Sequence, residues 1–179
     1  MKDIILINAK ARFGKDSLAT YICEELEKLN KTYLISHNAR AVKDLAYSFY
    51  NWDGQKDEKG RKLLIDITDT GYSYDEFFWE KKNKVNELDR DVYIIPDWRY
   101  LSSFNFFKDK GYNVTTIHID RPGFNNNLSS TLKNDKSEQG FKDFEFDYEV
   151  INNSLEDLKY AAKKIAKNVK RNMEKNSKN

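Results

Sequence analysis

Short apolar runs alternate along the chain with longer segments in which apolar residues recur every three or four positions. The runs have the length of buried strands and cover Ile4–Ile7, Thr32–Ile35, Val92–Ile95, Val114–Ile119 and Tyr148–Ile151. Strands that alternate with helices pair in parallel through right-handed crossovers. The pattern therefore predicts an α/β protein with three layers and a parallel sheet of about five strands.

Helical periodicity fills most of the intervals between these runs. The predicted helices begin near Ser17 or cover Ala39–Tyr50, Arg61 to about Ile67, Tyr74 to about Leu88, Leu101–Lys110 and a final segment after Ser154. The two middle stretches are expected to divide near Gly71, and Gly111 is a natural left-handed cap for the helix before it. Ser154 with Asp157 is typical of a helix N-terminus.

No Pro/Gly/Ser-rich linker divides the 179 residues, 39% of which are hydrophobic, so we expect one domain over residues 1–179. Within it, residues 36–90 form a helical region. Residues 124–146 are polar and carry no clear period, which is typical of a functional flap or a disordered loop. This segment is expected to be a mobile lid with too few apolar residues to hold itself down.

Composition excludes several classes of protein. One Cys and two His cannot build a four-ligand zinc site, and a single Cys forms no internal disulfide. No apolar run reaches the roughly 18 residues that a membrane span needs. The sequence therefore predicts a soluble, cytoplasmic protein of a reducing compartment, without a membrane partner. Cys23 is interpreted as a small structural hydrophobe, and His37 and His118 as ordinary residues.

Positive charge is concentrated at the end of the chain. The net charge is +2, whereas residues 159–179 carry eight basic residues against Glu174, a local +7, which leaves −5 on residues 1–158. Such a tail could bind nucleic acid. The solvated end of a terminal helix is the favoured interpretation, because no aromatic residue beyond Tyr160 could stack on bases. A nucleic-acid partner is therefore not expected.

The segment between the first strand and the first helix is the most informative part of the sequence. Its residues are predicted to form a phosphate-binding loop: Ala9, Lys10, Ala11, Arg12, Phe13, Gly14, Lys15, Asp16 and Ser17. Gly14 lets the backbone approach phosphate closely, and Lys15 supplies the point charge. The usual first glycine of such loops is Ala9 here, and Asp16 stands between the lysine and the hydroxyl residue Ser17.

Asp16 beside phosphates would be repulsive unless a cation lies between them, and Mg²⁺ is such a cation. Asp16 and Ser17 point about 100° apart on a helix, so one faces the metal and the other the acceptor. The sequence leaves both assignments open. Asp97 closes the run Val92–Ile95 and could hold a metal-bound water or orient Lys15.

The arginines gather near strand ends. Four of the seven lie at or just after the carboxyl end of a predicted strand: Arg12, Arg40, Arg99 and Arg121. That edge of an α/β sheet is where ligands bind, and the arginine fork suits phosphate. Arg61 begins a nearby helix, and Arg90 is interpreted as a surface charge.

Several motifs occur in the order found in one enzyme family. They are Gly14–Ser17, Ala39–Lys43, Arg61–Leu64, Asp75–Trp79, Asp97–Arg99, Arg121–Gly123 and the set Ser137-Glu138, Asp147-Tyr148, Asn152-Asn153. With these motifs the chain resembles deoxynucleoside monophosphate kinases of the bacteriophage type, within the P-loop nucleoside monophosphate kinase group. The chain departs from that family at Asp135, at Thr68–Tyr72 and at Ser103.

The resemblance implies a P-loop NTPase fold with a lid insertion and the cofactors ATP and Mg²⁺. It implies a (deoxy)nucleoside monophosphate as acceptor, which residues 36–90 would help to bind. The implied catalytic residues are Lys15, Asp16, Asp97, Arg99 and Arg121. The phosphate loop and Lys136 would bind ATP. The implied metal-binding residues are Ser17, Asp16 and Asp97. The implied acceptor-binding residues are Arg40, Lys43, Arg61, Trp79 and Arg99.

Alternatives remain at three points. Trp79 and Trp52 could stack on a base or pack in the core, the commoner role of a helical tryptophan. The enzyme could phosphorylate another phosphorylated small molecule, or the protein could bind nucleotide without turnover. The sequence leaves a monomer and a homodimer both open.

Overall fold

The computed structural model describes residues 2–83, 85, 88–124, 141 and 143–176. The chain divides into two compact units. Unit 1 consists of Met1–Ile35 and Arg90–Asn179, and unit 2 consists of Ser36–Asp89.

A five-stranded sheet is the centre of unit 1, in the order β2-β3-β1-β4-β5. The strands are β1 (Asp3–Ala9), β2 (Tyr33–Ile35), β3 (Val92–Ile95), β4 (Asn113–Asp120) and β5 (Tyr148–Ile151). Each neighbouring pair is parallel. The expectation of an α/β fold with about five parallel strands is confirmed.

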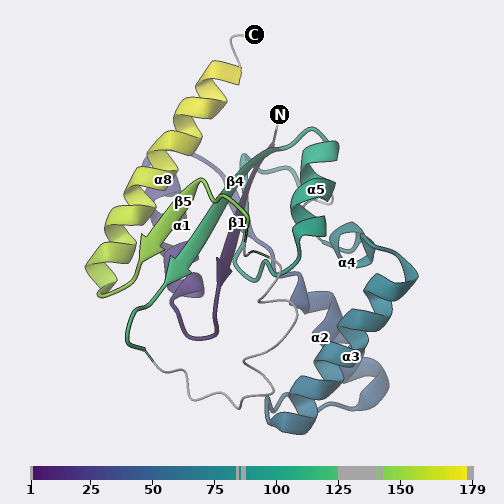
Figure 1. Cartoon of the computed structure of the whole chain (residues 1–179). Helices are drawn as coiled ribbons and strands as arrows, with labels where there is room; N and C mark the ends of the chain where they lie inside the picture. The colour runs from purple at the N-terminus through teal and green to yellow at the C-terminus, as the bar shows by residue number, and fades with distance from the viewer. Residues whose placement is uncertain (1, 84, 86–87, 125–140, 142, 177–179) are drawn as a thin grey trace. The chain divides into compact units, whose positions relative to one another are not determined.

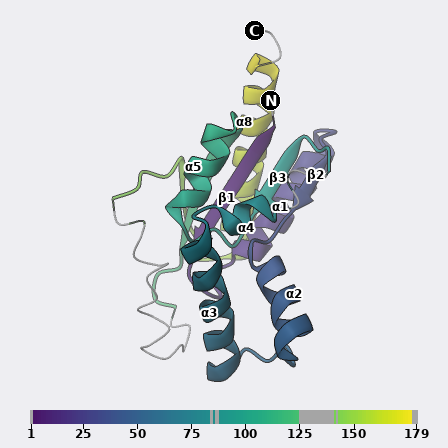
Figure 2. The same cartoon turned by 90° about the vertical axis from the view of Figure 1, so that its right-hand side faces the viewer.

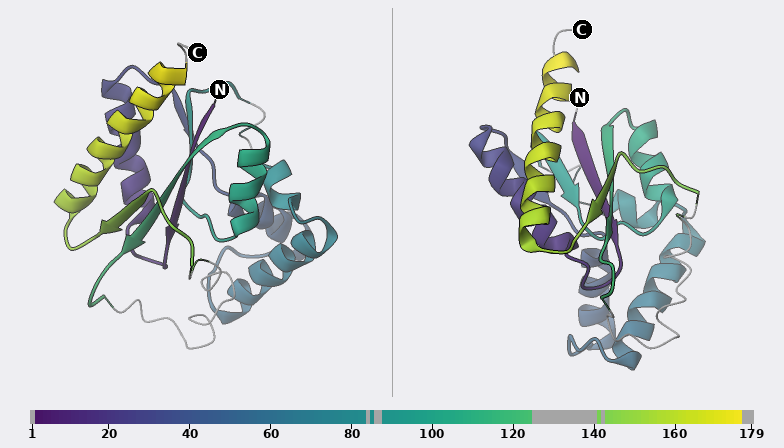
Figure 3. Two further views of the ribbon diagram at one scale, coloured as in Figure 1. Left: turned by 45° about the horizontal axis from the view of Figure 1, so that its top comes forward. Right: turned by 60° about the vertical axis from the view of Figure 1, so that its left-hand side comes forward.

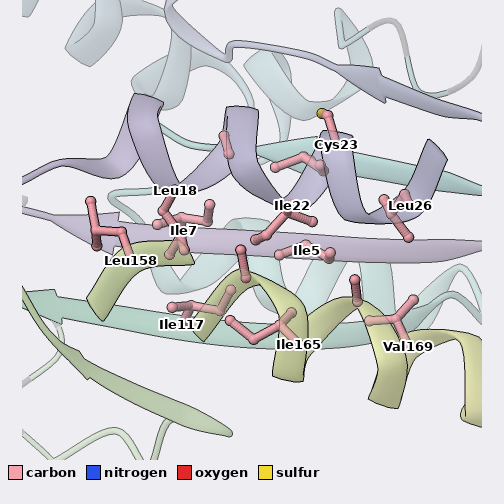
Figure 4. Close-up of a cluster of buried hydrophobic side chains, with 14 of the residues drawn as sticks. Ile5, Ile7, Leu18, Ile22, Cys23, Leu26, Ile117, Leu158, Ile165 and Val169 are labelled. Carbon is pink, nitrogen blue, oxygen red and sulfur yellow. The ribbon is translucent and has the colours of Figure 1, made fainter. Parts of the chain in front are cut away.

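Helices cover both faces of this sheet. Helices α1 (Lys15–Lys28) and α8 (Leu155–Asn176) lie together on one face, and α5 (Leu101–Asp109) lies on the other (Figures 1 and 3). The main core forms where α1 and α8 meet the sheet, and Figure 4 shows Ile22 of α1 and Ile165 of α8 there, both fully buried. These contacts give unit 1 the predicted three-layer α/β structure.

Strand order decides which loops share an edge. β1 lies in the middle of the sheet, between β3 and β4. The chain leaves β1 for α1 on one face, and later passes from β3 through α5 on the opposite face to β4. The carboxyl ends of β1, β3 and β4 therefore meet at a point where the helices change face, the usual ligand-binding position in such sheets.

Unit 2 is helical. Its elements are α2 (Ala39–Tyr50), α3 (Glu58–Tyr74) and the short α4 (Phe78–Lys81), and α2 and α3 run side by side (Figure 2). Its core contains Val42, Ala46, Trp52, Ile67 and Trp79.

The expected break near Gly71 is wrong. Helix α3 continues through Gly71 to Tyr74, and a separate short α-helix follows over Phe78–Lys81. Gly71 is buried because the Trp79 indole lies on it: a Cβ at this position would lie 2.5 Å from Trp79 Nε1. The glycine makes room for a side chain and does not end the helix.

Two of the predicted helix-end signals, at Gly111 and at Ser154 with Asp157, are confirmed. Gly111, which follows the C-cap residue of α5, has a φ of +76°, in the left-handed region. The Asp157 amide donates to Ser154 Oγ at 3.2 Å in the first turn of α8.

Among the described residues, none of the helices combines the length and the apolar character that crossing a lipid bilayer requires.

Asp3, at the start of β1, is a buried carboxyl group at the opposite end of the strand from the phosphate loop. Its side chain is 2% exposed and accepts a hydrogen bond from Asn113 Nδ2. Burial raises the pKa of Asp3 from 3.8 to about 6, against the lowering effects of Asn113 and Lys31, and Asp91 adds to the increase. Because the pKa of Asp3 in the folded protein lies above the unfolded value of 3.8, its protonated carboxyl group contributes to the free energy of unfolding. This contribution is fully present below pH 3.8 and is lost as the pH rises through 6.

Replacing this carboxyl group with an amide should therefore stabilise the protein at neutral pH. We expect Asp3→Asn to raise the free energy of unfolding at pH 7.5 by up to about 3 kcal/mol and to change it little at pH 4. Urea unfolding at both pH values measures the difference, with Asp69→Asn on the exposed surface of α3 as the control. A stabilisation equal at the two pH values would contradict the assigned pKa.

Candidate phosphate-binding site

The loop after β1 turns sharply before it enters α1. The Phe13 amide donates to the Lys10 carbonyl at 3.2 Å, and both Arg12 and Gly14 have positive φ, +68° and +97°. Gly14 is the N-cap residue, so Lys15 is the first residue of α1. The sequence prediction of a strand, a turn and a helix start in this order agrees with the structure.

The start of α1 offers backbone N–H groups to an anion. The first hydrogen bond of the helix runs from the Leu18 amide to the Gly14 carbonyl, at 2.9 Å. The amides of the residues before Leu18 precede this bond and have no partner within the helix. Together with the positive end of the helix dipole, they form a site suited to phosphate.

Two residues from distant strands hold the loop from outside. Asn152, which follows β5 and is 6% exposed, donates from Nδ2 to the Phe13 carbonyl at 2.9 Å. Its own amide donates to the Asp120 carbonyl at the end of β4, at 2.8 Å. Arg121 Nη1 donates to the Arg12 carbonyl at 3.3 Å. Two consecutive loop carbonyls are therefore bound on the β4–β5 side.

Lys15 and Asp16 form an ion pair with each other. The distance from Lys15 Nζ to Asp16 Oδ2 is 2.9 Å, and the Asp16 side chain is 66% exposed. An exposed pair of this kind adds little to stability and exchanges partners readily. Lys15 is therefore available to a more highly charged anion such as a triphosphate.

Asp97 lies two residues after β3, and the chain beyond it is hydrogen-bonded to β1. Asn8 Nδ2 donates to the Trp98 carbonyl at 3.1 Å, and the Trp98 amide donates to the Ile7 carbonyl at 3.3 Å. The half-buried Asp97 thus lies beside the strand end that begins the phosphate loop. Arg99, also half-buried, comes two residues later, before α5.

His118 of β4 contacts Asn8, the residue of β1 whose side chain donates to the Trp98 carbonyl. Its Nδ1 lies 2.9 Å from Asn8 Oδ1, and its ring packs on Phe146. Because Asn8 uses its Nδ2 for Trp98, Asn8 Oδ1 is the acceptor and the neutral His118 ring carries its proton on Nδ1. Burial lowers the pKa of His118, while Asp120 and Glu149 act in the opposite direction. The sequence interpretation gave His118 no role, but it helps to hold the turn after β3.

An aromatic cluster anchors the far end of the predicted lid. Trp98 is 1% exposed and contacts Phe141, Phe144 and Phe146, with ring centroids 4.6 Å, 5.4 Å and 5.9 Å away. The expectation that residues 124–146 lack the apolar contacts to hold themselves down is therefore wrong for these three residues. Residues 125–140 and 142, with Lys133, Asp135 and Lys136, lie outside the described residues.

The near end of that segment packs on the phosphate loop. Phe124 makes an edge contact with Phe13, with ring centroids 6.0 Å apart, and the Arg121 guanidinium lies 4.1 Å above the Phe124 ring. The pair of Arg121 and Phe124 thus contacts two successive loop residues, through the Arg12 carbonyl and the Phe13 ring.

The oxygen donors at this edge suit magnesium. Among residues 2–83, 85, 88–124, 141 and 143–176, no three His, Cys, Asp or Glu side chains gather where they could hold a metal by themselves. Mg²⁺ keeps several waters and binds one or two protein oxygens together with phosphate oxygens, so it does not need such a cage. The candidate oxygen donors for such a site are Ser17 or Asp16 in the first turn of α1 and Asp97 after β3.

The remaining candidate residues belong to unit 2. Arg40 Nε lies 3.9 Å from Asp44 Oδ2 on the exposed surface of α2, where the half-buried Lys43 follows. Arg61 Nε donates to the Lys56 carbonyl at 2.8 Å at the start of α3. Arg40 and Lys43 thus share the first turns of α2.

Trp79 requires a correction. Its side chain is 4% exposed in the core of unit 2, and its Nε1 donates to the Thr68 carbonyl at 2.9 Å. Trp52 is also buried and donates to the Gln55 carbonyl. Burial favours the core role for both tryptophans and removes Trp79 from the candidate base-stacking residues.

The residue that sequence reasoning missed as part of the site is Asn152. It entered the sequence analysis only as one member of a motif. The available signal was its place directly after an apolar strand and before a capped helix, at the sheet edge that also holds Gly14.

No family model and no curated protein sequence matches the chain. The solved structures that are similar over most of its length include the following three. A de novo designed protein with a P-loop NTPase fold has 14% identity and a TM-score of 0.40, covering 94% of this chain and 92% of that chain. Shikimate kinase from Aquifex aeolicus has 17% identity and a TM-score of 0.41, covering 98% of both chains. Guanylate kinase from Anaplasma phagocytophilum has 12% identity and a TM-score of 0.40, covering 96% of this chain and 86% of that chain.

Proposed function

We propose that the protein is an ATP-dependent phosphotransferase that converts a (deoxy)nucleoside monophosphate to the diphosphate. The observation that carries the proposal is the loop after β1, where Gly14 with a φ of +97° leads into a helix that begins with Lys15. Its amides and its lysine suit a polyphosphate, and Asp97 lies two residues beyond the end of the adjacent strand β3.

Phosphoryl transfer depends on positioning and on positive charge more than on covalent catalysis by the protein. In the proposed reaction, Lys15 and the loop amides bind the ATP phosphates, and Arg121 approaches the transferred group. Ser17 or Asp16, with Asp97, would hold Mg²⁺. When bound, Mg²⁺ would neutralise charge on the phosphate oxygens. The γ-phosphoryl group passes to an oxygen of the acceptor phosphate, which releases ADP and the diphosphate.

The acceptor is proposed from the family resemblance and from the cationic residues. Arg40, Lys43, Arg61 and Arg99 are proposed to bind the monophosphate through charge-assisted hydrogen bonds. Lys136 and Arg121 are proposed to belong to the lid that excludes water, since an open site would hydrolyse ATP.

A coupled assay for ADP release tests the proposal across all ribo- and deoxyribonucleoside monophosphates. We expect release that depends on one or a few of these acceptors, with little release in their absence. Release that responds only to a phosphorylated compound without a base would support the alternative of a different small-molecule kinase. ATP binding without any acceptor-dependent release would support a nucleotide-binding protein without turnover.

One observation favours that last alternative. Helix α8 carries exposed cations without a partner among the described residues: Lys163, Lys164, Lys167, Arg171 and Lys175. Such a surface could attract a polyanion such as nucleic acid. Fluorescence anisotropy with labelled DNA at two salt concentrations, together with the turnover assay, separates this candidate from a kinase.

Asp16 should act on turnover more than on ATP binding. We expect Asp16→Asn to lower kcat at least tenfold, because the carboxylate serves the metal or the acceptor in the transition state. The Kd for ATP should stay unchanged or fall, because the substitution releases Lys15 from its ion pair. Steady-state kinetics and calorimetry measure the two effects, and a normal kcat with weaker ATP binding would place Asp16 in ground-state binding instead.

A further inference from the structure

The phosphate loop is held by a side chain that lies outside it. Asn152 is almost completely buried, and its side-chain amide donates to the Phe13 carbonyl. Its backbone amide is bound to Asp120, so the position of Asn152 is set by the end of β4. Residue 152 is therefore a fixed point to which the loop is attached.

This hydrogen bond sets the direction of one peptide plane. In a trans peptide the C=O and the following N–H point in opposite directions. The Phe13 carbonyl points at Asn152, so the Gly14 N–H points away from Asn152. No hydrogen bond links the Gly14 N–H to another described residue, so this donor is available to a ligand. If the plane turned over, a carbonyl oxygen would point in that direction and repel phosphate.

Gly14 makes such a turn easy unless something prevents it. Glycine populates positive and negative φ about equally, so the plane that precedes it has several accessible orientations. Asn152 is also in close contact with Gly14: a Cβ on Gly14 would lie 2.6 Å from Asn152 Nδ2. The same amide group thus binds the carbonyl and occupies the space beside the glycine.

We propose that Asn152 is a positioning residue for the proposed reaction. Its side chain fixes the Phe13–Gly14 peptide plane so that the Gly14 N–H binds a phosphate of the nucleotide. The inference rests on the proposed function, because it assigns the anion to the phosphate loop. Asn153, which follows in the same turn, is exposed and provides a matched control.

The test uses two substitutions and two ligands. Asn152→Ala removes the donor, and Asn152→Asp keeps the shape while it places a carboxylate oxygen against the carbonyl. Calorimetry with ATP and with inorganic tripolyphosphate is done at a temperature where circular dichroism shows each variant to be folded. We expect affinity for both ligands to fall about 10-fold for Asn152→Ala and further for Asn152→Asp, with no change for Asn153→Ala.

A direct readout uses the wild-type protein alone. The amide resonance of Gly14 should shift strongly when tripolyphosphate is added to ¹⁵N-labelled protein, and the shift should be smaller in Asn152→Ala. A lower melting temperature with unchanged ligand affinity would show a purely structural role and overturn the inference. An unresponsive Gly14 amide in a wild-type protein that binds ATP would also overturn it. A wild-type protein that binds neither ATP nor tripolyphosphate would overturn the proposed function together with the inference.

Discussion

Lys15→Ala should reduce phosphoryl transfer by about 100-fold or more while the protein remains folded. The lysine is the first residue of α1, and within the described part of the chain its side chain pairs only with the exposed carboxylate of Asp16. Removing a preorganised charge that stabilises the transferred group costs a factor of this size in other enzymes. The side chain makes no contribution to the core, so the melting temperature should change by little.

The matched control lies in the same helix. Lys28→Ala removes an exposed lysine from the last turn of α1, where it pairs with Glu25 at 2.6 Å. This variant should keep wild-type kcat and ATP affinity, which separates the effect of Lys15 from a general loss of positive charge. If Lys15→Ala retained wild-type turnover with unchanged ATP affinity, the assignment of the phosphate loop would be wrong.

Local pattern was sufficient for most of the fold. The strands Val92–Ile95 and Tyr148–Ile151 and the helix Ala39–Tyr50 have the boundaries predicted from apolar periodicity. In each of these elements, the spacing of apolar residues along the sequence reflects whether one face or both faces are buried. The alternation of strands and helices implies parallel pairing through right-handed crossovers, so a parallel sheet of about five strands could be predicted, whereas the strand order was not.

Prediction was wrong where a residue acts through a distant partner. Gly71 was interpreted as a helix break, although its role is to accommodate the Trp79 indole. Phe141, Phe144 and Phe146 alternate with charged residues and show no useful period, yet they pack on Trp98, more than 40 positions earlier. The residue pattern around Trp98 does not indicate that these phenylalanines pack on it, and the pattern of residues 141–146 does not indicate Trp98 as their partner.

In the candidate site, too, the residues with a local signal were predicted and the residue that acts through a distant partner was not. Gly14 and Lys15 were predicted because a local arrangement of strand, glycine and lysine has a direct physical meaning for phosphate. The contribution of Asn152 depends on β5 ending beside β1's loop, 139 positions away from Phe13. Its importance became visible only when the carbonyl that it binds was known.

Gly14→Ala should impair the same loop from its other side. A Cβ would lie 2.6 Å from Asn152 Nδ2 and 3.1 Å from Leu158 Cδ1, and the residue would have to adopt a φ of +97°. Backbone strain and crowding of two buried side chains together should lower the free energy of unfolding by about 2–4 kcal/mol. The crowding should also displace Asn152 from the Phe13 carbonyl, so we expect ATP affinity to fall at least tenfold.

Gly111→Ala distinguishes crowding from strain. Gly111 also has a positive φ, +76°, but a Cβ there would meet no atom within 4 Å. This variant should lose about 1 kcal/mol of stability through the backbone alone and keep normal ATP affinity. Chemical denaturation and calorimetry on both variants give the comparison. Equal losses of stability, with ATP affinity preserved in Gly14→Ala, would mean that the contact between Gly14 and Asn152 does not control the loop.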